Sequence, residues 1–371
     1  MNLHQLATPC LLLDLDRLRR NCDRMLDVAR RGGVRLRPHL KTLKSHHAAQ
    51  LAMDESGAIT VSTLHEADWF AGHGVRDITC AVCLPPARTA DAWAIHRRID
   101  GPGLGVLVDD LAAAQQIVAQ LVALGARLPV WIEVDCGEHR TGVDPDGEVL
   151  LPLGRLLAGS PAVDFRGVLT HGGQSYRCAS VDEVRAVAET ERERVVFAAQ
   201  RLRDAGLPCP GVSAGSTPTA VHGACWDGVT ELRPGVYMAG DLFQVHMHSL
   251  GRDDLALSVL ATVISSRPDR CVVDAGGLAL SKDRSLRGLP QDPGFGEVLD
   301  LHGTPLQLHV ADVHQEHGEI RLPAGAPALP VGSRVRIWPN HVCMTAAAHD
   351  RYHVVQGDEV VAVWPRTNGW G

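Results

Sequence analysis

Aromatic residues are scarce in this sequence, since Phe, Trp and Tyr together make up only 4% of its 371 residues. The core must therefore be built mainly from Leu, Val, Ile and Ala. No stretch approaches the roughly 18 consecutive apolar residues that a membrane-spanning helix needs, so we expect no membrane partner. The formal net charge is -7, so the chain lacks the excess of basic residues that is typical of a general nucleic-acid-binding protein. Repeats and low-complexity segments are also missing.

The ten cysteines lack the regular spacing of a disulfide framework, because they are scattered from Cys10 to Cys343. The first five residues have neither the basic region nor the long apolar run of a signal peptide. We therefore expect reduced thiols and a cytoplasmic protein. The length predicts two domains, or one large barrel with an addition.

Up to about residue 245, short β-branched segments alternate with longer amphipathic ones, such as 110–124 and 181–205. Eight strands with helical connections predict a (β/α)₈ barrel. The glycines between 101 and 105 precede a strand, so we interpret them as a turn and not as a dinucleotide-binding loop. The predicted strands are 34–38, 58–62, 77–82, 104–109, 130–135, 165–170, 212–214 and 229–232.

After about residue 250 few helical patterns remain, which predicts a second, mostly β domain. The Gly- and Pro-rich segment 284–297 is expected to be a loop between its strands. The predicted strands of this domain are 255–265, 271–274, 307–311, 334–338, 353–355 and 359–364.

Polar and small residues follow five of the predicted barrel strands. Because barrel enzymes place their sites at the carboxyl ends of the strands, we expect an anion-binding active site at that face. The segments are 37–44, 135–142, 170–176, 213–219 and 233–238.

The last two of these segments suit a phosphate, since small residues let backbone N–H groups approach an anion and hydroxyls add donors. The alternative is that residues 216–219 only cap the next helix. Lys41 follows the first strand and could act as a Schiff-base nucleophile, the alternative being a solvated surface charge. A phosphate site together with a lysine is what pyridoxal phosphate needs.

Five motifs carry a family resemblance: TPCLLLDLD at 8–16, RPHLKTLK at 37–44, VSAGSTPT at 212–219, PNHVCMT at 339–345 and WPRTNGW at 364–370. Together they resemble the fold-type III pyridoxal-phosphate enzymes of the alanine racemase superfamily. Within it, the chain is most similar to the D-serine dehydratase and D-threonine aldolase family, which includes the D-threo-3-hydroxyaspartate dehydratases. The resemblance implies a cofactor-binding barrel over 16–248, and a β domain carrying a metal site over 1–15 and 249–371.

The resemblance also implies roles for individual barrel residues. Lys41, and not Lys44, matches the Schiff-base lysine. Arg140 matches the position that contacts the phenolic oxygen of the cofactor, and His171 the position that packs on the pyridine ring.

Two positions near the pyridine nitrogen are left open by the resemblance. Arg233 corresponds to the racemase arginine that meets this nitrogen. Tyr176 could serve the nitrogen or the substrate instead. The phosphate cup is matched by Ser216, Thr217, Gly235 and Val236.

His341 and Cys343 form a His-x-Cys pair in the β domain. Two ligands rarely hold zinc by themselves, and a buried cysteine beside a structural histidine is the alternative. The resemblance implies a divalent metal here, completed by water and substrate oxygens. Thiolate favours Zn²⁺, with Mn²⁺, Co²⁺ and Mg²⁺ as alternatives. Cys343 and His171, where the aldolases more often have Asp and Tyr, favour the dehydratase branch.

Other candidate ligands remain open. His314 with His317, and separately His349, either border the site or have structural roles. Cys80 and Cys83 fit a C-x-x-C pattern, but residues three apart on a strand face opposite ways, so we expect no function for this pair.

The resemblance implies a lyase that eliminates water from a D-3-hydroxy amino acid of the D-serine or D-threo-3-hydroxyaspartate type. The products are a 2-keto acid and ammonia, with Lys41 as the base at the α-carbon and the metal as a Lewis acid. The alternatives are retro-aldol cleavage to glycine and an aldehyde, amino-acid racemisation, and a non-catalytic pyridoxal-phosphate-binding protein. By analogy with relatives, we expect a homodimer.

Overall fold

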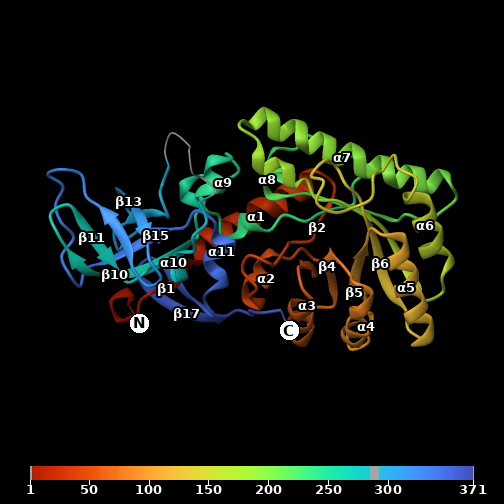
Figure 1. The fold of residues 1–371 in the computed structure, drawn as a ribbon, viewed down its shortest axis with the longest axis horizontal. Coiled ribbons are helices and arrows are strands. Elements are labelled where there is room, and N and C mark those ends of the chain that lie inside the picture. The colour runs from red at the N-terminus through yellow and green to blue at the C-terminus, as the bar shows by residue number, and fades with distance from the viewer. Residues whose placement is uncertain (1, 285–291, 371) are drawn as a thin grey trace. The chain divides into compact units, whose positions relative to one another are not determined.

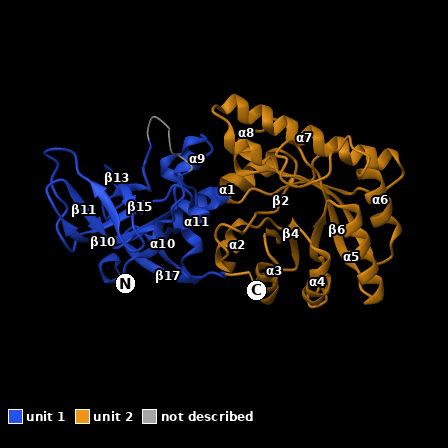
Figure 2. Cartoon of the chain, viewed as in Figure 1, with its two compact units in different colours: residues 1–22, 236–368 blue, residues 23–235, 369–371 orange. Residues whose placement is uncertain are grey.

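The structure, a computed structural model, describes residues 2–284 and 292–370. The chain divides into two compact units, Met1–Cys22 with Val236–Asn368 and Asp23–Gly235, coloured separately in Figure 2. The two units meet in the sequence at 22/23 and 235/236. The domain boundaries expected at 15/16 and 248/249 lie near these positions and remain a prediction. Within the described residues, no helix is both long and apolar enough to cross a membrane.

The unit of residues 23–235 is built around a parallel eight-stranded sheet with the order β2-β9-β8-β7-β6-β5-β4-β3 (Figure 1). A single bridge between His39 and Thr60 joins the two end strands, so the barrel is nearly closed. The predicted barrel is confirmed, and each predicted strand overlaps an observed one. The strands are β2 (Arg35–Leu36), β3 (Ala58–Val61), β4 (Asp77–Cys83), β5 (Gly103–Val108), β6 (Leu128–Glu133), β7 (Val163–Leu169), β8 (Gly211–Ala214) and β9 (Glu231–Leu232).

The barrel helices begin and end at residues that the sequence marks. Helix α5 (Leu111–Ala123) begins after Asp110, whose side chain accepts the N–H of Ala113, and the chain turns away at Gly125 with a φ of 59°. Helix α7 (Val181–Asp204) has Ser180 as its N-cap. The other helices of the first 235 residues are α1 (Leu15–Arg31), α2 (His46–Ala52), α3 (Leu64–Gly72), α4 (Thr89–His96), α6 (Leu150–Gly159) and α8 (Thr217–His222).

Buried ion pairs lie at the amino-terminal end of the barrel. Arg37 is 4% exposed and lies 2.7 Å from Asp77 and 2.9 Å from Glu231. The Arg37 guanidinium thus bridges two carboxylates, and the fully buried Glu231 also accepts from Arg35 at 3.0 Å, which compensates for its burial. Arg37, which opens the polar segment 37–44, therefore has a structural role.

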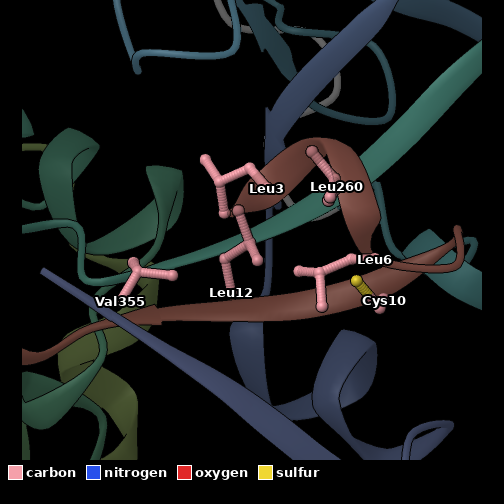
Figure 3. Packing of buried hydrophobic residues seen from close by; sticks show 6 residues of the cluster. All are labelled: Leu3, Leu6, Cys10, Leu12, Leu260 and Val355. Carbon is pink, nitrogen blue, oxygen red and sulfur yellow. The ribbon is translucent and has the colours of Figure 1, made fainter. Parts of the chain in front are cut away.

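The other unit contains a nine-stranded sheet with the order β11-β14-β13-β12-β15-β10-β1-β16-β17. Strand β1 (Cys10–Asp14) lies antiparallel to β10 (Leu257–Ser266) and parallel to β16 (Arg351–Gln356). Aliphatic side chains pack between these segments (Figure 3), among them Leu12, Leu260 and Val355. The remaining strands are β11 (Arg270–Val273), β12 (Glu297–Leu299), β13 (Pro305–Val313), β14 (Gly318–Arg321), β15 (Arg334–Trp338) and β17 (Glu359–Pro365).

The sequence did not predict every element of this unit. Strands β12 and β14, of three and four residues, were missed. The expected loop 284–297 ends where β12 begins, and residues 285–291 lie outside the described part. Short helices were also missed: α9 (Leu242–His246), α10 (Gly277–Leu280) and α11 (Val342–Ala347).

Candidate functional site

A cavity of about 290 Å³ lies beyond the carboxyl ends of the barrel strands. Four residues singled out in the sequence line it, from the loops after β2, β6, β7 and β9, namely Lys41, Arg140, His171 and Arg233. The structure therefore brings together residues up to 192 positions apart in the sequence. Its other lining residues are His39, Ser62, Ala81, Val82, Cys83, Glu133, Thr141 and Leu169.

The cavity is cationic through Lys41 and two arginines, and its histidines are neutral. Burial lowers the pKa of His39 well below its usual value, and the charges of Lys41 and Arg233 lower it further. The pKa of His171 is lowered by burial and by the same two cations, with Arg140. Both imidazoles can therefore serve as neutral hydrogen-bonding groups beside the amine.

The side chains of the two arginines in the cavity differ in how firmly hydrogen bonds hold them. Arg233 is 3% exposed, and its guanidinium donates to Ser213 Oγ at 2.8 Å and to the carbonyl of Thr170. Arg140 is half exposed, and its Nη1 lies 3.4 Å from Glu138 Oε1. Arg233 is thus fixed, whereas Arg140 can move toward a bound anion.

The two lysines of the first loop also differ. Lys41 lines the cavity, and its backbone N–H faces His39 Nδ1 at 3.4 Å. Lys44 Nζ lies 3.0 Å from Glu66 Oε1, on helix α3. An amine that is held by a buried carboxylate is not available as a nucleophile, which supports the choice of Lys41.

The residues expected to form the phosphate cup do not belong to the described lining of this cavity. Ser216 caps α8 by accepting the N–H of Thr219, so the helix-cap alternative is realised. Its Oγ also lies 3.1 Å from Ser175 Oγ. At Gly235 a Cβ would meet the carbonyl oxygen of His39 at 2.5 Å, so this close approach requires glycine.

Three other residues stand apart from the lining. Thr217 is the buried first residue of α8. Val236 belongs to the other compact unit, where it begins a short 3-10 helix, Val236–Met238. The centroid of the Tyr176 ring lies 6.4 Å from that of the His171 ring.

Cys83 lies in the cavity wall, where no function was expected for it. Its thiol donates to Glu133 Oε2 at 3.1 Å, and ligand atoms of Cys83, Asp109 and Glu133 lie within 4.8 Å of one another. This geometry could hold a metal ion. Burial and the two carboxylates, however, raise the pKa of the thiol, which disfavours the thiolate that a metal would bind.

The His-x-Cys pair lies at the start of α11, and two acidic residues surround it within the same unit. His341 Nδ1 lies 2.7 Å from Asp283 Oδ2. Burial lowers the pKa of His341, but Cys343, Asp241 and Asp283 together raise it to about 10. The Asp241 carboxylate accepts the N–H of Val342 at 3.0 Å, and burial raises its pKa to about 6.

Imidazole, thiolate and carboxylate are donor types that divalent metals such as Zn²⁺ accept, once the imidazole has lost its proton. A carboxylate that holds one ring nitrogen of His341 orients the other toward a ligand position. Asn340 donates to the backbone carbonyl of Asp283 at 3.1 Å and so fixes its position. The sequence offered no signal for Asp283, which lies 58 residues before His341.

Among the other histidine candidates, the ring of His349 has a backbone partner. His349 Nε2 lies 3.1 Å from the carbonyl of Ala279, and burial lowers its pKa. His314 and His317 lie in the turn between β13 and β14, where the backbone N–H of His314 donates to the backbone carbonyl of His317. A structural role therefore accounts for His349.

Comparison with known proteins confirms the resemblance seen in the sequence. Residues 13–242 match the alanine racemase N-terminal domain, and residues 256–355 match a putative serine dehydratase domain. The chain is 45% identical to D-threo-3-hydroxyaspartate dehydratase of Delftia sp. (strain HT23), over 98% of both chains. It is 30% identical to a D-threonine aldolase of Arthrobacter sp, over 98% of this chain and 92% of the relative.

The structure gives a similar result. A cysteine-to-alanine mutant of D-threo-3-hydroxyaspartate dehydratase, in the metal-free form, superimposes with a TM-score of 0.95 and 43% identity over 100% of both chains. The chain therefore belongs to the family of D-threo-3-hydroxyaspartate dehydratase and D-threonine aldolase, which joins an alanine racemase N-terminal domain to a serine dehydratase domain.

Proposed function

We propose that this protein is a pyridoxal-phosphate- and metal-dependent lyase that removes water from a D-3-hydroxy amino acid, giving a 2-keto acid and ammonia. The observation that carries the proposal is the cationic cavity at the carboxyl ends of the strands, where Lys41 lies among His39, His171 and Arg233. The 45% identity to a dehydratase, against 30% to an aldolase, favours elimination over cleavage.

The residues of the cavity fit the cofactor. Lys41 would hold it covalently, and His171 would pack beside its ring. Arg140 and Arg233 would balance its negative charge. The cup of Ser216, Thr217, Gly235 and Val236 would hold its phosphate, since hydroxyls and a glycine backbone suit an anion. In the other unit, His341 and Cys343 would bind the metal, with Zn²⁺ preferred because of the thiolate.

When bound, pyridoxal phosphate supplies an electron sink for charge at the α-carbon, and the metal supplies a Lewis acid. The chain supplies the proton transfers and the orientation. Once the amino group of the substrate had displaced it from the cofactor, the freed Lys41 amine would remove the α-proton, and the neutral state of His39 would add no further positive charge beside it. Arg233, held by Ser213 and Thr170, keeps its orientation during the reaction. In the net reaction the β-hydroxyl leaves as water together with the α-proton, and a second water molecule hydrolyses the product, supplying the keto oxygen and releasing the amino group as ammonia.

The aldolase alternative uses the same residues to break the bond between Cα and Cβ. Offering the purified protein D-serine, D-threo-3-hydroxyaspartate and D-threonine, with and without a chelator, distinguishes the two. Keto acid and ammonia support the proposal, whereas glycine and an aldehyde favour the aldolase. Turnover that a chelator does not affect would refute the metal's role. We further propose a homodimer by analogy with relatives, which sedimentation of the purified protein tests.

A further inference from the structure

Helix α7 carries one charged residue on its buried face. The buried positions of this helix recur at helical spacing, and all but one of them are apolar. The exception is Glu191, which is 0% exposed. Its neighbours Glu189 and Glu193 have side chains that are 47% and 63% exposed. A carboxylate at a core position costs free energy unless specific partners compensate for it.

The partners of Glu191 come from two loops at the cavity end of the barrel. Its Oε1 accepts the N–H of Gly172 at 2.6 Å and the N–H of Gly215 at 2.9 Å. Gly172 directly follows His171 in the loop after β7, and Gly215 directly precedes Ser216 in the loop after β8. One oxygen atom therefore joins the loop of the cavity histidine to the loop of the expected phosphate cup.

Three further contacts close this arrangement. The His171 side chain hydrogen-bonds to the backbone of Gly215. Burial raises the pKa of Glu191, while the Thr219 side chain and the two glycine N–H groups oppose that rise. The hydroxyl of Thr219 lies 3.0 Å from Ser216 Oγ. The Glu191 carboxylate thus contacts both the loop after β7 and the loop after β8. We call this connection between the two loops the junction.

The contact between Glu191 and the backbone of residue 172 requires glycine at that position. A Cβ there would lie 2.9 Å from the carboxyl carbon of Glu191, closer than real Cβ contacts come. Only a residue without a side chain lets the carboxylate approach the backbone N–H this closely.

We propose that Glu191 is a positioning residue that fixes His171 and the Ser216 loop relative to each other, so that the ring and the phosphate of one cofactor are held together. The identity of the ligand in this inference rests on the proposed function. The junction between the two loops is a feature of the structure and does not depend on that function. It extends the site beyond the residues that line the cavity, since Glu191 acts only through the two loops.

Three substitutions in the full-length protein test this role. Glu191→Leu keeps the volume and removes the acceptor. Glu191→Gln keeps an oxygen that both N–H groups can reach. Glu193→Gln, two residues along the same helix and exposed, is the matched control. If Glu191→Leu does not fold, Glu191→Asp withdraws the carboxylate by one methylene and serves instead.

The first measurement is the dissociation constant of pyridoxal phosphate, from titration of its visible absorption. We expect Glu191→Leu to weaken binding at least about tenfold, because two buried N–H groups lose their acceptor, and Glu191→Gln to stay within about threefold of wild type. Equal affinity in Glu191→Leu and wild type would overturn the inference. Equal loss in the Leu and Gln variants would also overturn it, since the shared oxygen would then not be the cause.

The second measurement is amide hydrogen exchange without added cofactor, in peptides covering 170–176 and 211–219. We expect exchange to accelerate in both peptides of Glu191→Leu, and in neither peptide of Glu193→Gln. Unchanged exchange would overturn the junction. A wild type that binds no pyridoxal phosphate would overturn the proposed function, while the exchange data would still decide whether Glu191 joins the loops.

Discussion

The Lys44 ammonium lies 3.0 Å from the buried carboxylate of Glu66, whose other oxygen accepts the N–H of Ser62 at 3.0 Å. Two lysines three residues apart thus have different surroundings: one is held by a carboxylate, and Lys41 lines the cavity. This difference separates the residue that we expect to bind the cofactor from a residue that stabilises the fold.

The first prediction uses this difference. Lys41→Ala is expected to abolish the visible absorption of the bound cofactor and to leave the folded state intact. Lys44→Ala is expected to retain the absorption but to lower the free energy of unfolding by about 3 kcal/mol, because it leaves Glu66 buried without its cation. Absorption spectra and urea unfolding measure the two effects. Loss of the absorption in Lys44→Ala alone would reverse our assignment.

The second prediction concerns the orientation of a metal ligand. Asp283→Asn keeps the shape but removes the charge that holds His341 Nδ1, so we expect metal affinity to fall about 10–100-fold. His341→Ala and Cys343→Ala are expected to lose the metal. Metal content after equilibrium dialysis measures this without any assay of turnover. Cys225→Ala, a partly buried cysteine of the barrel unit, is the control and should bind metal like wild type.

The third prediction follows from the neutral histidines. In the unfolded chain their pKa is near the ordinary value of about 6.5, whereas in the folded protein it is lower. As the pH falls below about 6.5, the unfolded state binds more protons, so stability is full above that pH and is lost on acidification. Each histidine contributes a slope of at most about 1.4 kcal/mol per pH unit.

Urea unfolding between about pH 8 and pH 5 measures this slope. We expect His39→Gln to reduce it, because one buried group no longer titrates. A slope that is unchanged in His39→Gln would show that this imidazole does not have the lowered pKa described above.

The fourth prediction concerns the close approach of Gly235 to the His39 carbonyl. Gly235→Ala is expected to lower the free energy of unfolding by about 1–3 kcal/mol, because the backbone would have to move. Gly159→Ala, whose Cβ would meet nothing within 4 Å, is the control. Thermal unfolding compares the two variants. Similar stability in both variants would mean that the loop containing Gly235 can shift without lowering the free energy of unfolding.

The sequence predicted the barrel well because regular alternation of buried strands and amphipathic helices is a local signal, as at β5 and α5. It missed β12, which is short and depends on its neighbours β13 and β15 for pairing. Arg140 and His171 could be expected because they follow strands of a barrel. Asp283 and Glu191 could not, because their roles arise only when distant segments come together.

As a dehydratase, the protein would eliminate water from its substrate and leave the carbon–carbon bond intact. The most direct test incubates the purified protein with D-threo-3-hydroxyaspartate and measures ammonia, 2-keto acid and glycine in the same sample. We predict equal amounts of ammonia and 2-keto acid, no glycine, and no product with Lys41→Ala. Glycine and an aldehyde in equal amounts, without ammonia, would show that the protein is an aldolase and not a dehydratase.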